Sequence, residues 1–202
     1  MKESETIYLR LFEPEDFEKT YHWHNDFNSL LLTCGPLRYV SKEIEKKWAY
    51  SKATNNSNEI YLAACLKETD EMIGYCSILN IDWQNRKCTY GGLVIGEKQY
   101  KDGDAFMEIG PIILDYIFNE LNMNRTSTRA LKEHAIIRAS LEAAGWCLEG
   151  TERDSIFKNG SYHDACNYSM LRSEFINREP LSKSQKIKKM VEIAKRIKRE
   201  EM

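Results

Sequence analysis

The sequence lacks long apolar runs, paired cysteines and a large net charge. No apolar stretch approaches the ~20 residues that a helix needs to cross a bilayer, and the opening MKESETIYLR does not have the pattern of a signal peptide. The six cysteines are scattered, with no CxxC pair and no spacing typical of zinc ligands. We therefore expect a cytoplasmic protein with reduced thiols, no membrane span and no bound metal.

The net charge of −2 hides an uneven distribution. From Leu181 to the end of the chain, eight Lys or Arg residues accompany three Glu residues, so the preceding body is acidic. An acidic body attracts a cationic amine, although a solvated acidic surface is an equal interpretation. The basic tail also has an apolar stripe at helical spacing and no aromatic residue for base stacking, which does not favour nucleic acid as a partner. We predict a tail helix over 176–202 that docks on the acidic body, with a partner or an anionic surface as alternatives.

Hydrophobic periodicity predicts mixed strands and helices in a single domain over 1–175. Alternation and turn signals predict strands over 6–12, 59–68, 71–82, 88–96, 124–131, 153–157 and 162–171. Helical spacing and start signals predict helices over 13–26, 41–53, 111–121 and 134–146. Asn159-Gly160 predicts a tight hairpin between the last two strands. This order is typical of an α/β or α+β fold with a largely antiparallel central sheet.

Six segments in this order resemble the GNAT N-acetyltransferase superfamily, in the branch of ribosomal-protein alanine and spermidine acetyltransferases. The resemblance covers roughly residues 6–175 and is carried by LRLFEPEDFEKTYHWHND, MIGYCSIL, LVIGEKQY, LDYIFNELNMNR, SLEAAGWCLEG and FKNGSYHDACNYSML. It implies a GNAT-like fold, in which a mostly antiparallel mixed sheet is flanked by helices and splays in a V between its fourth and fifth strands. It also implies an acetyltransferase that uses acetyl-CoA as co-substrate.

In that family the pantetheine arm of acetyl-CoA pairs with the backbone of the fourth strand, here Leu93, Val94 and Ile95. The pyrophosphate binds the loop that opens the next helix, where free N–H groups and the helix dipole favour an anion. The resemblance places this loop on Tyr100–Glu108 and assigns cofactor contacts to Lys101, Asp102, Gly103, Asp104 and Ala105. His134, after the fifth strand, is a further expected cofactor contact.

The family's loop is rich in glycine, and this sequence departs from that pattern. In a gapless match the three glycine positions hold Asp102, Asp104 and Phe106, whereas a shift by one residue retains Gly103 and Ala105. Two aspartates near a pyrophosphate weaken its binding, and Lys98 and Lys101 offset them. The following helix begins either near Asp104, with Pro111 inside it, or at Gly110-Pro111.

The resemblance also locates the catalytic positions. The family's Asn after the fifth strand matches His134, its proton-donating Tyr matches Leu141, and its acidic residue on the fourth strand matches Tyr90 or, in another register, Thr89. Leucine cannot transfer a proton, so the candidate catalytic residues are Tyr90, His134 and Ser140, among which His134 has the most suitable pKa. A solvent-facing His134 at a helix start is an equal interpretation.

Four further positions are singled out by residue type. Arg138, and less favourably Arg129, suits the 3′-phosphate of the cofactor, with a surface charge as the alternative. Trp23 and His24 correspond to the acceptor side of the family's cleft, although core packing is the stronger interpretation of Trp23.

Two histidine pairs have ordinary structural explanations. His22 and His24 point about 200° apart on a helix, so we do not expect them to share a metal. His163 and Asp164 are neighbours on a strand and face opposite sides, so we interpret them as hairpin structure.

Two functions remain open from sequence. The first is acetyl-CoA-dependent N-acetylation of a primary amine, such as a peptide N-terminus, a polyamine or an amino sugar, by direct attack in a ternary complex. The second is a catalytically degenerate GNAT-like module that binds or regulates with weak CoA binding or none. A homodimer through the C-terminal hairpin or tail is compatible with either.

Overall fold

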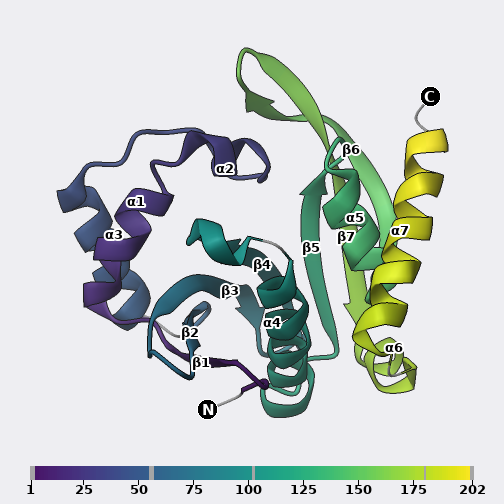
Figure 1. The fold of residues 1–202 in the computed structure, drawn as a ribbon, viewed down its shortest axis with the longest axis horizontal. Coiled ribbons are helices and arrows are strands. Elements are labelled where there is room, and N and C mark those ends of the chain that lie inside the picture. Colours follow the sequence, from purple (N-terminus) through teal and green to yellow (C-terminus); the bar gives the residue numbers. More distant parts are fainter. Residues whose placement is uncertain (1–2, 55–56, 102, 180, 201–202) are drawn as a thin grey trace. The chain divides into compact units, whose positions relative to one another are not determined.

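The computed structural model describes residues 3–54, 57–101, 103–179 and 181–200. Within these residues, seven strands form a sheet in the order β1-β2-β3-β4-β5-β7-β6 (Figure 1). The sheet is mostly antiparallel, with β4 parallel to β5, and helices flank it. This confirms the expected fold class; the splay between the fourth and fifth strands stays a prediction. No helix in the described ranges combines the length and the apolar character needed to span a membrane.

The chain forms two compact units, which are described separately. Unit 1 contains residues 1–26 and 38–126, and unit 2 contains residues 27–37 and 127–202. Strand β5 (Arg125–Leu131) begins in unit 1 and continues in unit 2. The predicted domain boundary at residue 175 stays a prediction.

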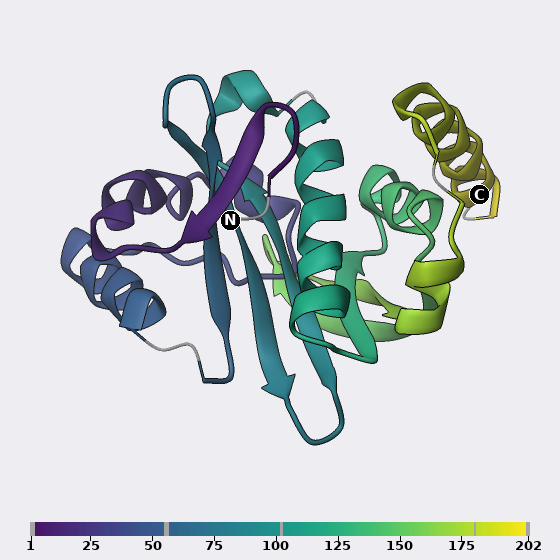
Figure 2. The same ribbon diagram turned by 90° about the horizontal axis from the view of Figure 1, so that it is seen from below.

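Unit 1 is built on four consecutive antiparallel strands. These are β1 (Ile7–Leu11), β2 (Ile60–Leu66), β3 (Met72–Asp82) and β4 (Lys87–Ile95), and each pairs with the next. Helices α1 (Phe17–Trp23) and α3 (Lys42–Thr54) lie on one side of these strands, and α4 (Asp104–Asp115) lies on the other (Figure 2). Short turns at η1 (Pro14–Asp16) and η2 (Lys98–Tyr100) precede α1 and α4.

Helix α4 begins at Asp104, so the structure selects the earlier of the two predicted starts. Pro111 lies inside it and lacks the N–H that would bond the carbonyl of Met107. The helix then widens into a π-helical turn, η3 (Tyr116–Glu120), in which the N–H of Leu121 bonds the carbonyl of Tyr116. The apolar face of α4 and η3 supplies four fully buried side chains to the core, those of Ile109, Ile113, Ile117 and Phe118.

Unit 2 consists of the hairpin β6 (Cys147–Lys158) and β7 (Ser161–Leu171), the remainder of β5, and helices α2 (Phe27–Leu31), α5 (Ala135–Ala143), α6 (Arg172–Asn177) and α7 (Lys183–Glu200). The predicted Asn159-Gly160 turn is confirmed, because both residues have positive φ, 47° and 78°. Strand β6 starts six residues before the predicted Arg153. Its side chains are exposed almost throughout, so no alternating apolar pattern marks it in the sequence.

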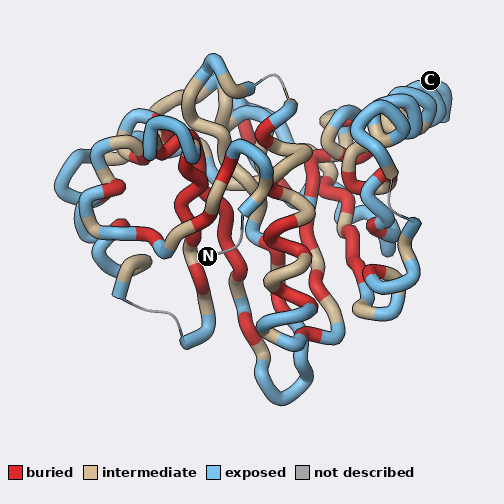
Figure 3. The backbone as a smooth tube through the Cα atoms, turned by 60° about the horizontal axis from the view of Figure 1, so that its bottom comes forward, coloured by how far each residue is buried: buried red, intermediate tan, exposed pale blue. Residues whose placement is uncertain are grey.

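Helix α7 docks on α5 of the same unit, as expected. The buried Ile197 and the partly buried Met190, Ile193 and Ala194 form its apolar stripe, which packs against Ala135 and Ala139. Most of the rest of α7 is exposed, as the blue tube in Figure 3 shows.

We predict that Ile197→Ala lowers the free energy of unfolding by about 2–4 kcal/mol, because it empties a buried site between α5 and α7. Ile197 is 1% exposed, whereas Ile187 of the same helix is 38% exposed. Ile187→Ala, the matched control, should change stability by less than about 1 kcal/mol in urea unfolding. Equal effects of the two substitutions would contradict docking through this stripe.

Candidate active site

Strand β4 carries a bulge at a pair of glycines. Ser77 of β3 pairs with Gly92, and the next residue, Ile78, pairs with Tyr90, so Gly91 is the extra residue. Gly92 has φ of 104°, and a Cβ at Gly91 would lie 2.3 Å from the hydroxyl of Ser77. Both positions therefore require glycine. Bulges redirect backbone groups near active sites, and the Gly-Gly doublet inside a strand pattern is a signal that the sequence interpretation missed.

The three predicted cofactor residues on β4 follow this bulge directly. Leu93, Val94 and Ile95 are half-buried and pair with Cys76, Tyr75 and Gly74 of β3. The pairing occupies one edge of β4. Their role in holding a pantetheine arm stays a prediction.

The loop after β4 leads into the start of α4. Gly103 caps α4 in the left-handed conformation, with φ of 101°, and its carbonyl accepts a hydrogen bond from the N–H of Met107. Asp104 is the exposed first residue of α4, and Ala105 behind it is buried. Lys101 lies 3.5 Å from the carboxylate of Asp26. Asp102 lies outside the described residues.

Trp23 packs on the end of β4. A Cβ built on Gly96 would fall 1.9–2.3 Å from atoms of the Trp23 indole, so the ring lies against bare backbone. The indole also stacks on the ring of Tyr75 at 6.5 Å and is 8% exposed. Trp23 is therefore a core residue that fixes the strand end, in agreement with the stronger of its two sequence interpretations.

His24 joins a buried hydrogen-bond chain. Its Nδ1 lies 3.0 Å from the carboxylate of Glu45, and its Nε2 lies 2.8 Å from the hydroxyl of Tyr75. Glu45 also accepts a hydrogen bond from Thr20. Glu45 is 1% exposed, and burial of an unpaired carboxylate would be costly. This series of hydrogen bonds therefore connects α1 and α3 to β3. No residue spacing in the sequence indicated that these side chains would be partners.

Tyr90 is buried on β4, next to the bulge. Burial raises the pKa of its phenol well above the ordinary value of 10. The phenolate that a general base needs is therefore strongly disfavoured here, whereas the protonated phenol keeps its proton.

His134 is the cap residue of α5 in unit 2. Its N–H bonds the carbonyl of Leu131, and its own carbonyl accepts from the N–H of Arg138. Partial burial lowers the pKa of the imidazole, while the backbone of Leu32 acts in the opposite direction. The imidazole of His134 is therefore neutral at neutral pH and can accept a proton. Its partial burial also differs from the solvent-facing side chain of the alternative interpretation.

Arg138 is buried rather than a surface charge. Its guanidinium donates to the carbonyl of Lys132 at 2.7 Å and lies 3.4 Å from the hydroxyl of Tyr168. Burial raises the pKa of Tyr168 to about 12, so this hydroxyl stays protonated. Arg138 thus supports the loop between β5 and α5. Arg129, the other candidate for a phosphate contact, lies 3.4 Å from the carboxylate of Glu152.

Ser140 and Leu141 differ in their surroundings on α5. The Ser140 hydroxyl donates to the carbonyl of Ile136 at 2.8 Å and lies 2.9 Å from the sulfur of Met190 in α7. Leu141 is 6% exposed within the core. The predicted catalytic role of Ser140 would require the hydroxyl to leave these contacts.

Lys158 is a buried ionisable residue that sequence reasoning missed. This residue at the end of β6 is 2% exposed, and its ammonium donates to the carbonyl of Leu30. The hydroxyl of Thr33 lies 3.5 Å away. Burial lowers the pKa of Lys158. This contact connects α2 to the β6–β7 hairpin. The sequence does not predict it, because a single Lys next to a turn signal has no recognisable pattern.

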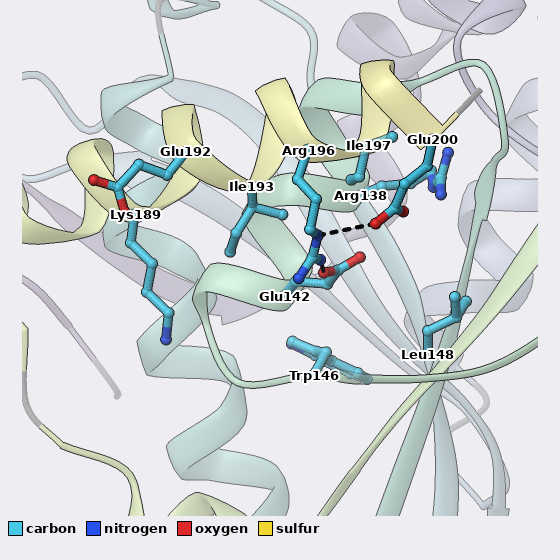
Figure 4. Close-up of a pocket in the computed structure, with 10 residues that line it drawn as sticks. All are labelled: Arg138, Glu142, Trp146, Leu148, Lys189, Glu192, Ile193, Arg196, Ile197 and Glu200. Carbon is cyan, nitrogen blue, oxygen red and sulfur yellow. Dashed lines mark hydrogen bonds and ion pairs between the residues drawn. The ribbon is translucent and has the colours of Figure 1, made fainter. Parts of the chain in front are cut away.

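A cavity of about 580 Å³ lies between α5, the start of β6 and α7 (Figure 4). Arg196 points from α7 across to Glu142 of α5 and also pairs with Glu200. The lining mixes three basic and three acidic side chains over an apolar floor that includes Trp146 and Leu148. Because its charges balance and several pair with one another, the cavity has no net attraction for an ion.

Comparisons with known proteins agree with this architecture. The model of the acetyltransferase (GNAT) domain family matches residues 6–146. The chain is 25% identical over 191 residues to the putative ribosomal N-acetyltransferase YdaF of Bacillus subtilis (strain 168), covering 86% of this chain and 96% of the relative. It is also 25% identical over 173 residues to the uncharacterized N-acetyltransferase p20 of Bacillus licheniformis, covering 85% and 96%.

Solved structures show the same fold. The spermidine N-acetyltransferase from Vibrio cholerae, in complex with CoA and spermine, superposes with a TM-score of 0.78 at 21% identity, covering 86% of this chain and 100% of that one. A mutant form of the spermidine N-acetyltransferase from Vibrio cholerae gives a TM-score of 0.75 at 20% identity, covering 87% and 99%. Because the sequence identities are this low, these two structures show a shared fold and no more.

We predict that Gly96→Ala lowers the free energy of unfolding by about 1–3 kcal/mol, because its methyl group would overlap the Trp23 indole. Gly110→Ala is the matched control. A Cβ there meets nothing within 4 Å and lies inside α4, so alanine should raise stability by about 0.5–1 kcal/mol. Thermal and urea unfolding measure both, and opposite signs are expected. If Gly96→Ala leaves the free energy of unfolding unchanged, the packing of the Trp23 indole does not require glycine at position 96.

Proposed function

Because the chain belongs to the acetyltransferase (GNAT) domain family, which matches it over residues 6–146, we propose that it acetylates a primary amine with acetyl-CoA. The amine attacks the donor directly in a ternary complex. The protein is an acetyltransferase, and its family implies acetyl-CoA as the acetyl donor. The observation that supports the proposal most strongly is the Gly91-Gly92 bulge in β4, immediately before the three predicted cofactor residues.

The residues at the end of β4 fit the donor chemically. Leu93, Val94 and Ile95 would hold a pantetheine arm through their backbone, as a neighbouring strand would. Gly103 opens α4 in the left-handed conformation. The first N–H groups of a helix have no partner within it, so a helix start favours a pyrophosphate. Lys101 adds positive charge before this start, whereas Asp104 opposes an anion.

Among the candidate acceptors, a polyamine fits best. One structural relative is a spermidine N-acetyltransferase in complex with CoA and spermine, and the acidic body of this chain attracts polycations. A peptide N-terminus is the second choice, because a relative is named as a ribosomal N-acetyltransferase. An amino sugar is the third.

The chain offers several groups for proton transfer. His134 is held at the cap of α5 in a partly buried setting that favours the neutral imidazole, so it can accept a proton. Tyr90 keeps its proton, so it cannot act as a base, and its raised pKa also makes it a weak proton donor. Ser140 is turned toward α7, which makes it the weakest of the three. Arg138 supports the loop that carries His134 and remains the candidate for the 3′-phosphate.

A catalytically degenerate binding module is the second candidate function. It is favoured by the buried Leu141, which stands where the family has a proton donor, and by the carboxylate of Asp104 at the start of α4. Its distinguishing property would be weak binding of acetyl-CoA or none.

The state of the cysteines bears on where the protein is located. All six cysteines are free thiols, which suits a reducing compartment such as the cytoplasm. A homodimer through the hairpin or the tail stays part of the proposal.

We predict that Asp104→Asn tightens binding of acetyl-CoA by about fivefold in calorimetric titration at moderate salt. Removing one like charge near a pyrophosphate is worth ~1 kcal/mol in water. Asp115→Asn removes the same charge at the other end of α4, and it should leave the affinity unchanged.

Micromolar binding by the unmodified protein supports the enzyme, and acetyl transfer is then assayed over polyamines, peptides and amino sugars. Absence of binding up to millimolar concentration contradicts the proposed enzyme and leaves the binding module. An unchanged affinity in Asp104→Asn would mean that the anion binds away from the start of α4.

A further inference from the structure

Helix α1 contacts the segment that joins β4 to α4, and both belong to unit 1. Three side chains spaced for one helical face make the contacts, namely Lys19 with Glu97, Trp23 with Gly96, and Asp26 with Lys101. The first contact is an ion pair at 2.9 Å, and the second is packing on bare backbone. The third joins a carboxylate to the loop that opens α4, where an anionic donor is expected to bind.

The backbones of Asp26 and Lys101 are both fixed by turns. The N–H of Asp26 bonds the carbonyl of Trp23 at 3.2 Å, directly after α1. The N–H of Lys101 bonds the carbonyl of Lys98 at 3.3 Å and so closes the short η2 turn. Lys101 is therefore held at a defined point, two residues before Gly103, and its side chain can change partner without movement of the backbone.

The pair of Asp26 and Lys101 is an exchangeable contact. Its N–O distance of 3.5 Å is longer than that of an ordinary hydrogen bond, and each of the two side chains is 30% exposed. Exposed ion pairs contribute little to stability, because water screens the two charges. A pyrophosphate carries more negative charge than one carboxylate, so it can take the ammonium of Lys101 from Asp26.

The pair also changes the charge balance of the loop. The sequence alone suggests that Lys101 offsets the negative charge of the loop, but in the structure Asp26 already neutralises Lys101. The exposed Asp104, at the first position of α4, therefore opposes an anion with less compensation than the sequence indicates. Asp26 and Lys101 are 75 residues apart, so no motif connects them.

We propose that Asp26 sets the affinity for acetyl-CoA by competing with the pyrophosphate of the donor for Lys101. The inference rests on the proposed function and adds to it a residue that determines donor affinity. In the empty protein the ammonium of Lys101 is paired with Asp26, and on binding it turns to the pyrophosphate at the start of α4. Loss of the first contact offsets part of the gain from the second.

Two other roles of Asp26 give different results. A pair that only holds the loop in place would support binding, so its loss would weaken the binding of acetyl-CoA. A carboxylate that repels the donor directly would act whether or not Lys101 is present. The three roles are therefore separated by the direction of the effect and by its dependence on Lys101.

The experiment is calorimetric titration of the purified chain with acetyl-CoA at moderate salt, as a double-mutant cycle. Asp26→Asn should tighten binding about fivefold, because Lys101 no longer has to leave a carboxylate. Lys101→Gln should weaken binding about fivefold, because the cation is lost. In the Lys101→Gln background, Asp26→Asn should change the affinity by less than about twofold, since no ammonium remains to compete for.

Fragments of the donor locate the anion that Lys101 meets. Acetyl-pantetheine has no phosphate, so Asp26→Asn should leave its affinity unchanged. Acetyl-dephospho-CoA lacks only the 3′-phosphate, so the effect of Asp26→Asn should remain. Glu18→Gln is the matched control, because it removes the same charge from another exposed position of α1, and it should leave the affinity for acetyl-CoA unchanged.

Each contrary result overturns the competition in its own way. Weaker binding by Asp26→Asn would make the pair a structural support. An equal gain with and without Lys101 would make Asp26 a direct repulsive charge. Loss of the effect with acetyl-dephospho-CoA would assign Lys101 to the 3′-phosphate and exclude the pyrophosphate. Thermal unfolding of each variant close to that of the unmodified protein excludes misfolding as the cause of a changed affinity.

Failure of this inference is distinguishable from failure of the proposed function. If the unmodified protein binds acetyl-CoA and Asp26→Asn binds it equally well, the role of Asp26 alone is overturned. If neither protein binds acetyl-CoA up to millimolar concentration, both the inference and the proposed function are overturned.

Discussion

The packing of Trp23 on the bare backbone of Gly96 is the contact on which the rest of unit 1 depends. It fixes the end of β4 against α1, and the stacked Tyr75 extends this contact to β3. The hydrogen-bond chain through His24 and Glu45 then ties α1 and α3 to the same strand. The part of β4 that follows the glycine bulge is therefore held in place by this cluster, against which Val94 also packs. A site built on backbone groups needs such support, because a strand that shifts by even about 1 Å no longer presents its amides correctly.

Part of this architecture could be predicted from the sequence because it is encoded locally. Alternating apolar residues marked β1, apolar runs bounded by turn signals marked β2 and β3, and Asn159-Gly160 marked the hairpin turn, since both residues must adopt positive φ. The first half of β6 could not be predicted, because its side chains are exposed and carry no alternation. Helix α2 is short and has no buried side chain, so it leaves no periodic pattern either.

The site was harder to predict than the fold, because its contacts join residues that are distant in the chain. His24 and Glu45 are 21 residues apart, and Glu133 and His163 are 30 apart. A single sequence contains no information on such pairs beyond the residue types. Family resemblance supplied His134 and the β4 residues. Residue type alone suggested Arg138, either as a phosphate contact or as a surface charge; its burial excludes the surface charge and adds a supporting role in the β5–α5 loop.

The distribution of polar groups also limits where proton transfer can occur. On α5, Leu141 is buried and Ser140 faces α7, so neither of these two positions offers an acid or a base as the family's tyrosine does. On β4, burial keeps Tyr90 protonated. The loop between β5 and α5 differs, because it carries His134 and Glu133, and the carboxylate of Glu133 holds the imidazole of His163 from β7. Burial lowers the pKa of His134 and Glu133 raises that of His163, so the two rings change charge at different pH values. Two titrating groups whose pKa values are moved apart by their surroundings are the arrangement from which acid and base roles can be assigned.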